Sequence, residues 1–134
     1  TLDYISSLPD DSSHPLLSRK TQKINFVGSW SVKLKPNGFH VNHVHPEGWL
    51  SSSFYVKVPD FSLYSQAEEH AGAIKFGESS LQLKGREKIA RIITPKPGLV
   101  AIFPSYVWHG TIPFNGPDDV CRLTAPCDIT PSED

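Results

Sequence analysis

Short runs in which apolar and polar residues alternate, each ended by turn residues, constrain the fold of this chain more than any other feature. In residues 50–58 the even positions are mostly apolar and the odd positions mostly polar, and Pro59 follows. Side chains two residues apart share a face of a β-strand, so this period predicts a half-buried strand. A similar alternation over residues 26–34 precedes a Pro-Asn-Gly turn at 36–38. Residues 39–45 are therefore predicted to return as the second strand of a hairpin.

The rest of the chain continues this pattern and predicts an all-β fold. Twelve prolines and nine glycines are spread along the chain, and further strand-like runs lie at residues 73–76, 88–93, 99–103, 108–113 and 120–125. About eight short strands with almost no helical pattern indicate a β-sandwich or jelly roll. Leu2, Ile5 and Leu8 recur at helical spacing before Pro9, so one short N-terminal helix is expected. Residues 60–70 are polar and acidic without a clear period, and are interpreted as a loop or short helix.

Length and charge exclude several classes of function. With 134 residues the chain is long enough for one packed domain, which we take to span 1–134. Thirteen Lys and Arg nearly balance 14 Asp and Glu, and the formal charge of -1 provides no field to recruit nucleic acid or an anionic membrane. No run approaches the ~20 apolar residues of a membrane span, and the first residues do not have the order of a signal peptide. A soluble, cytoplasmic protein without nucleic-acid or membrane partners is expected.

The two cysteines and the absent methionine give two further expectations. Cys121 and Cys127 are too few for the disulfide framework of a small secreted domain, which favours reduced thiols inside a cell. The chain has no Met, even at position 1. Thr1 is therefore interpreted as a processed or internal position, and the chain as part of something longer.

Histidines provide the first candidates for chemistry. His40, His43 and His45 lie in the predicted strand 39–45, where alternation places His43 and His45 on one face and His40 on the other. Two imidazoles on one face can share a metal ion, and His109 can supply a third ligand from a distant strand. The alternative pairs His45 with Glu47, which together with His109 gives two histidines and one carboxylate. Both sets are typical of metal centres that leave coordination positions open.

Arg122 is the second candidate, because it lies on a predicted strand among apolar residues. Arg122 and Thr124 share one face of that strand. A guanidinium inside a small barrel is costly unless it meets an anion, and a carboxylate ligand would form a bidentate pair with it. Equally open from the residues alone are a salt bridge to Asp118 or Asp119 and simple exposure to solvent.

Several blocks of the sequence, in order, resemble the 2-oxoglutarate- and Fe(II)-dependent oxygenases. They are residues 28–34, the run HVNHVHPEGWLS at 40–51, residues 54–56, the run FPSYVWHGT at 103–111, and Arg-Leu-Thr at 122–124. More narrowly, the chain is similar to the catalytic domain at the C-terminus of some bacterial tetratricopeptide-repeat proteins. The resemblance covers roughly residues 9–128, and it accounts for the absent Met, since a domain that follows a repeat array need not begin with one.

The resemblance implies a double-stranded β-helix, a cupin-like jelly roll, with iron held at its open end. The family's ligands fall on His43, His45 and His109, where His45 occupies the position that is Asp or Glu in most of these enzymes, and Glu47 is the alternative carboxylate. The cosubstrate anchor falls on Arg122, with Thr124 beside it. Tyr55 matches a tyrosine that binds the distal carboxylate of 2-oxoglutarate in prolyl hydroxylase-like relatives. The implied cofactors are Fe(II) and 2-oxoglutarate, and the implied reaction is substrate hydroxylation with release of succinate and CO2.

Two other functions fit the same residues. A cupin-like three-histidine dioxygenase or isomerase would use the metal without 2-oxoglutarate, and a jelly-roll module could bind a peptide or glycan without turnover. The substrate itself, a small molecule or a protein, is open at this point. A repeat region, if attached, would favour a protein substrate, because repeat arrays bind proteins along an extended concave surface.

Overall fold

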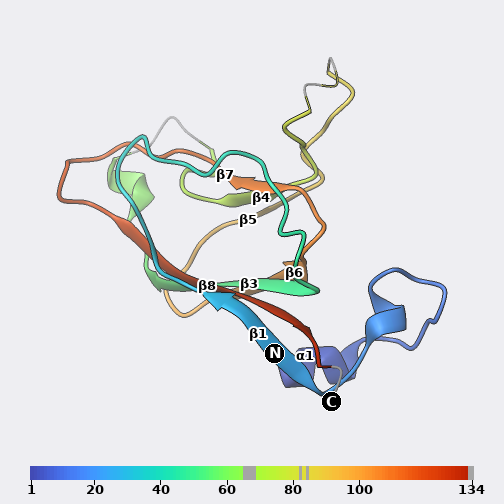
Figure 1. The fold of residues 1–134 in the computed structure, drawn as a ribbon. Helices are drawn as coiled ribbons and strands as arrows, with labels where there is room; N and C mark the ends of the chain where they lie inside the picture. Colours follow the sequence, from blue (N-terminus) through green and yellow to red (C-terminus); the bar gives the residue numbers. More distant parts are fainter. Residues whose placement is uncertain (65–68, 82, 84, 133–134) are drawn as a thin grey trace.

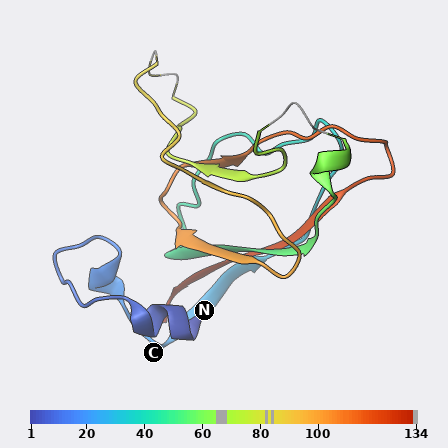
Figure 2. The same cartoon turned by 180° about the vertical axis from the view of Figure 1, so that it is seen from behind.

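The chain folds into two antiparallel sheets that lie as two layers (Figures 1 and 2). The computed structural model describes residues 1–64, 69–81, 83 and 85–132. The larger sheet has the order β1-β8-β3-β6, with β2 also paired to β8, and the smaller sheet has the order β5-β4-β7. The strands are β1 (Ile24–Ser29), β2 (Val32–Leu34), β3 (Leu50–Lys57), β4 (Ile74–Phe76), β5 (Arg91–Ile93), β6 (Val100–Pro104), β7 (His109–Thr111) and β8 (Arg122–Pro131). Helical turns are few: α1 (Leu2–Ser7) and the 3-10 turns η1 (Leu17–Arg19) and η2 (Phe61–Leu63).

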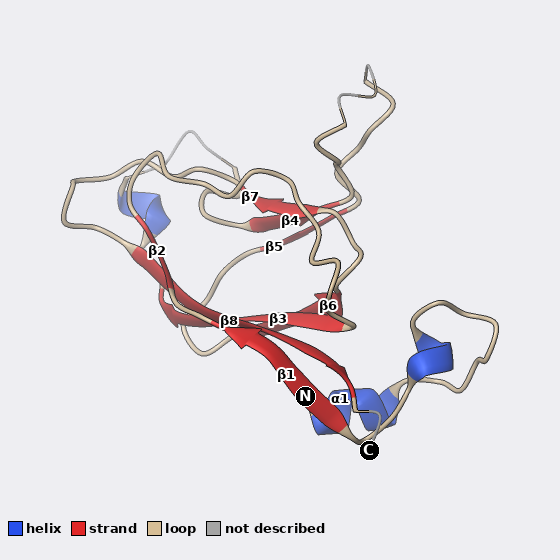
Figure 3. Ribbon diagram, viewed as in Figure 1, coloured by secondary structure: helices blue, strands red, loops and turns tan. Residues whose placement is uncertain are grey.

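The order in which the chain visits the two sheets confirms the predicted double-stranded β-helix. It passes from β3 in the larger sheet to β4 and β5 in the smaller one, returns to β6, crosses to β7 and ends on β8 (Figure 3). The short N-terminal helix is also confirmed, and it ends before Pro9 as expected. No described helix is long and apolar enough to cross a membrane. Of the predicted loop 60–70, residues 65–68 lie outside the described part of the chain.

The predicted hairpin of residues 26–34 and 39–45 is wrong, although its turn forms. Asn37 has a φ of 64°, and the Gly38 amide donates to the Lys35 carbonyl over 2.9 Å. β2 pairs with β8 instead, with Val32 opposite Thr124. Residues 39–45 instead cross to the smaller sheet, where they form no regular strand and make a single bridge from His43 to His109 of β7.

The apolar core lies partly between the sheets and partly under the N-terminal segment. Phe76 and Phe103 meet between the two layers with ring centroids 5.1 Å apart. At the other site, the side chain of Ile5 is completely buried in a cluster with Leu16, Trp49, Leu50 and Ile129. The Trp49 indole N–H donates to the Leu16 carbonyl over 2.9 Å, which ties the N-terminal segment to the start of β3. Burial of a side chain such as Ile5 contributes about 1.5–3 kcal/mol.

The polar face of β3 points inward. Tyr55 is 1% exposed and Ser51 and Ser53 are buried, whereas Phe54 is 41% exposed on the outer face. Polar groups buried between two sheets cost free energy unless they find partners. This reversal of the usual inside-apolar pattern makes the space between β3, β8 and β7 a candidate binding site.

Candidate functional site

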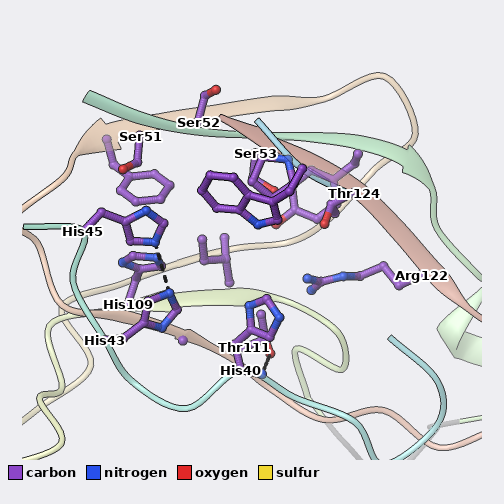
Figure 4. A pocket seen from close by; sticks show the side chains of 16 residues that line it. His40, His43, His45, Ser51, Ser52, Ser53, His109, Thr111, Arg122 and Thr124 are labelled. Carbon is purple, nitrogen blue, oxygen red and sulfur yellow. Dashed lines mark hydrogen bonds between the residues drawn. The ribbon is translucent and has the colours of Figure 1, made fainter. Parts of the chain in front are cut away.

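A pocket lies between the two sheets, with imidazoles at one end and a guanidinium at the other (Figure 4). Its walls come from β3, β7, β8 and the segment 40–45 that crosses between the layers. That segment approaches β7 closely because residue 110 is glycine. A Cβ on Gly110 would lie 2.3 Å from the Asn42 side-chain oxygen and 3.0 Å from the His40 carbonyl. Any larger residue there would push the histidine-bearing segment away from β7.

His43, His45 and His109 form a cluster that fits a metal ion. Each offers one ring nitrogen, and these atoms all lie within 4.8 Å of one another. The sequence analysis placed His43 and His45 in one predicted strand, 39–45, and His109 in a distant strand. The structure brings them together through the His43–His109 bridge and a backbone hydrogen bond of 2.9 Å from His45 to the Ser105 carbonyl.

Hydrogen bonds fix the tautomers of these imidazoles. Nδ1 of His43 lies 2.7 Å from the Val41 carbonyl, and Nδ1 of His109 lies 2.9 Å from the Val107 carbonyl. Oxygen acceptors of this kind require Nδ1 to carry the hydrogen, which leaves the Nε2 lone pair for a ligand-binding role. The Nε2 atoms of His43 and His45 face each other at 3.1 Å, where two lone pairs repel unless a cation lies between them. The donor set therefore fits a divalent metal that accepts imidazole.

Burial keeps His109 neutral. It lowers the pKa of His109 to about 4, despite the hydrogen bond to the Val107 carbonyl, which acts in the opposite direction. A histidine must be neutral to coordinate a metal, so His109 is in its metal-binding form at pH 7.

A buried carboxylate stands behind the histidine cluster. Asp128 on β8 is buried, and its Oδ2 lies 2.5 Å from Nδ1 of His45. Its other oxygen accepts a hydrogen bond of 2.7 Å from the Ser51 hydroxyl, which is itself 2.9 Å from the Ser105 hydroxyl. Glu47, the carboxylate considered from the sequence, is exposed and is not a member of the histidine cluster.

Arg122 is buried, and no carboxylate in the described part of the chain pairs with it. It is 3% exposed, and among the described residues it forms no ion pair, which excludes both exposure and a salt bridge to Asp118 or Asp119. Its Nη1 donates to the Gly72 carbonyl over 2.5 Å, whereas its buried Nε has no hydrogen-bond partner. Burial lowers the pKa of Arg122, but a guanidinium remains charged at neutral pH. An uncompensated buried cation points to an anionic ligand.

Hydroxyl groups lie beside that cation. The Arg122 guanidinium lies 5.4 Å from the centroid of the Tyr55 ring, and Thr124, 1% exposed, is directly opposite Tyr55 in the register of β3 and β8. Burial raises the pKa of Tyr55, so its phenol stays protonated and can donate a hydrogen bond. Lys57, which follows on the same face of β3, is exposed and does not line the pocket.

Sequence reasoning missed two residues of this site. It placed His40 on the face opposite His43, but the segment is not a strand, and His40 lines the pocket between His43 and Arg122 (Figure 4). The His40 amide donates to the Thr111 hydroxyl over 2.7 Å, which holds that position. Asp128 was also missed, although the period of two that begins at Arg122 and Thr124 reaches it if the strand is extended to Pro131.

Comparison with known proteins gives one family and a shared fold. The family model described as "Putative 2OG-Fe(II) oxygenase" matches residues 28–128. Among solved structures, an oxidoreductase of the 2OG-Fe(II) oxygenase family from Burkholderia pseudomallei aligns with a TM-score of 0.60 at 10% identity, covering 81% of this chain and 45% of that one. A prolyl-4-hydroxylase from Pseudomonas putida aligns with a TM-score of 0.52 at 17% identity, covering 78% and 51%. This chain thus spans about half the length of either protein. A search of curated proteins found no match.

Proposed function

Because this chain belongs to the 2OG-Fe(II) oxygenase family, we propose that it oxidises a substrate at an Fe(II) centre with 2-oxoglutarate as cosubstrate. The observation that carries the proposal is the pairing, in one pocket, of three imidazoles with free Nε2 lone pairs and a buried guanidinium that forms no ion pair with any described carboxylate. A metal and a dicarboxylate would satisfy both ends of the pocket at once. When bound, they would supply, with O2 as the oxidant, the oxidative decarboxylation of 2-oxoglutarate to succinate and CO2, coupled to hydroxylation of the substrate, one oxygen atom entering succinate and the other the substrate.

His43, His45 and His109 are the proposed metal ligands. Their Nδ1 atoms are held by acceptors, so the rings need not reorient when the metal binds. A histidine binds a metal through a neutral imidazole, so this ligand set would contribute no negative charge. Such a set usually includes a carboxylate. Here the carboxylate of Asp128 contacts Nδ1 of His45 and is not itself one of the proposed ligands.

Arg122, Tyr55 and Thr124 are the proposed binding groups for the far carboxylate of 2-oxoglutarate. A guanidinium and two hydroxyls offer several donors to one carboxylate, and the pairing would compensate the buried guanidinium charge by a charge-assisted contact. The buried side chains of this end also exclude water, which strengthens that contact.

The class of substrate and the setting in which the domain works are also part of the proposal. A small molecule or a protein is compatible with the family. The resemblance to domains that follow tetratricopeptide repeats supports a protein substrate brought by an attached repeat region, with 1–134 acting as a single catalytic domain in the cytoplasm.

The proposal is tested by adding Fe(II) and 2-oxoglutarate to the purified protein under anaerobic conditions. A visible metal-to-2-oxoglutarate charge-transfer band is expected, followed by succinate formation when air is admitted. Iron binding without the band would indicate a metal enzyme that does not use 2-oxoglutarate. Failure to bind either iron or 2-oxoglutarate would favour a binding module.

Asp128→Asn tests the carboxylate behind His45. The amide oxygen can still accept from Nδ1 of His45 while its NH₂ group faces Ser51, so the ring keeps its position but loses the neighbouring charge. We expect Fe(II) affinity to fall about 10- to 100-fold, the range found for changes of this kind. Anaerobic titration with Fe(II) measures this. Asp119→Asn, the same change at an exposed aspartate that does not line the pocket, is the matched control, and an equal loss of affinity in both variants would contradict the assignment.

A further inference from the structure

The first strand of the larger sheet has an open edge that is unusual in its composition. β1 lies at the end of the sheet and, in the described part of the chain, pairs only with β8 (Figure 3). Its sequence, Ile-Asn-Phe-Val-Gly-Ser, has no charge and no proline. Exposed edges normally carry charges, prolines or a cover, because unpaired backbone groups recruit other strands. Phe26 on this edge strand is 72% exposed.

A groove runs from this strand to the histidine cluster. It is lined by Val27 of β1, by Trp30 and Glu47, and by the outer sides of His43 and His45. The Trp30 ring stacks on the His45 imidazole, with centroids 5.8 Å apart and planes inclined by 25°. The groove therefore extends from β1 to two of the proposed metal ligands; it shares Trp30, His43 and His45 with the pocket that holds Arg122, but Arg122 does not line it.

The charge of the groove indicates what it would accept. Glu47 is exposed, and no described Lys, Arg or His forms an ion pair with it. Asp128, the other acid of the groove, is buried and committed to His45 and Ser51. An apolar wall of Val27 and Trp30 beside one free carboxylate is complementary to an aliphatic chain with a cationic end.

We propose that an extended peptide segment adds to the edge of β1 as a further strand, with a Lys or Arg of that segment on Glu47 and a neighbouring side chain presented to the metal centre. Main-chain hydrogen bonds to β1 would give affinity, and the groove would give specificity, as in other cases of strand addition. The assignment of the presented side chain as substrate rests on the function proposed above. Binding of the peptide to the edge does not depend on it.

The test uses a synthetic library of random decapeptides, acetylated and amidated so that their ends carry no charge, selected on the immobilised protein. We expect enrichment of peptides rich in β-branched or aromatic residues with a Lys or Arg. Phe26→Lys should weaken the binding of an enriched peptide, measured by fluorescence anisotropy, at least about tenfold, because a charge on the edge opposes strand addition. Phe54→Lys is the matched control: it replaces an exposed Phe on β3, whose two edges are both paired, and should change the affinity less than twofold.

Glu47→Lys tests the charge preference. Selection on this variant should lose the enrichment of Lys and Arg in favour of Asp and Glu. Amide hydrogen exchange supplies a readout that does not need turnover, since β1 amides should gain protection when the peptide binds.

Three results would overturn the proposal: no peptide enriched above background, equal loss of affinity in Phe26→Lys and Phe54→Lys, or a dimer of this chain that Phe26→Lys converts to monomer. The last would assign the edge to a second copy. A different result would contradict the proposed oxygenase function alone: the charge-transfer band would be absent although the peptide still binds.

Discussion

His109→Ala is expected to abolish the Fe(II)-dependent conversion of 2-oxoglutarate to succinate. His109 is the one cluster member held on a regular strand, and the bridge to His43 makes it the point at which the two halves of the cluster meet. Without it, His43 and His45 offer only two neutral donors, too few to hold iron against water. A loss of at least about a thousandfold in turnover is expected, equivalent to about 4 kcal/mol of transition-state stabilisation. Succinate formation and anaerobic iron binding measure it.

A folding control is essential for this variant, because His109 also packs on Phe103 with ring centroids 4.6 Å apart. His109→Gln fills more of the space and should retain the fold while losing iron. His14→Ala, which removes an exposed histidine of the N-terminal segment, should bind iron as the original chain does. A folded His109→Gln protein with unchanged turnover would rule out His109 as a ligand.

Alternation predicted the face of each strand well where strands are regular. In β3 it separated Ser51, Ser53 and Tyr55 from Phe54, and the structure buries the first three around the pocket. The same period could not say which face is inside. A polar face is normally the solvent side, whereas here the polar face of β3 lines the pocket in which we propose the metal and anion to bind.

Local pattern failed where tertiary pairing decides the backbone. Residues 39–45 have the composition of a strand, but β2 pairs with β8 and not with them. They cross instead to β7, and the crossing turns His40 into the pocket. Neither event can be seen in the sequence of the segment, because it depends on a strand that lies about 80 residues further along the chain. The wrong strand prediction did not change the three metal-binding candidates. His43, His45 and His109 were chosen because their imidazoles can share a metal ion, and this requires only that they lie close together, not that residues 39–45 form a strand.

Arg122→Met is expected to remove the affinity for 2-oxoglutarate without weakening the fold. The loss of a buried charge-assisted pair costs about 2–5 kcal/mol of binding, so the Kd for 2-oxoglutarate should rise by at least about thirtyfold. Titration of the anaerobic Fe(II) protein, followed by its charge-transfer band, measures this. Iron affinity without 2-oxoglutarate should stay the same, because Arg122 is at the opposite end of the pocket from the cluster of His43, His45 and His109 (Figure 4).

Lys57→Met is the matched control for this variant. It also replaces a cation of the larger sheet by a side chain of similar length, but Lys57 is exposed and does not line the pocket. Its effect on the affinity for 2-oxoglutarate should be less than twofold. A larger effect for Lys57→Met than for Arg122→Met would contradict the assignment of Arg122 as the anchor.

The change in stability distinguishes a ligand anchor from a structural cation. If Arg122 held the sheets together through an ion pair, its removal would destabilise the protein by about 3–5 kcal/mol. Here the guanidinium is buried, donates to the Gly72 carbonyl and leaves Nε without a partner, and none of the described carboxylates forms an ion pair with it. Replacing an uncompensated buried charge by an apolar side chain removes a desolvation cost, so the free energy of unfolding of the ligand-free protein should stay the same or rise by up to about 2 kcal/mol. Urea denaturation with and without 2-oxoglutarate measures both effects. The ligand should raise the free energy of unfolding of the original chain. Without the ligand, Arg122→Met should be no less stable than the original chain, and 2-oxoglutarate should not stabilise it further.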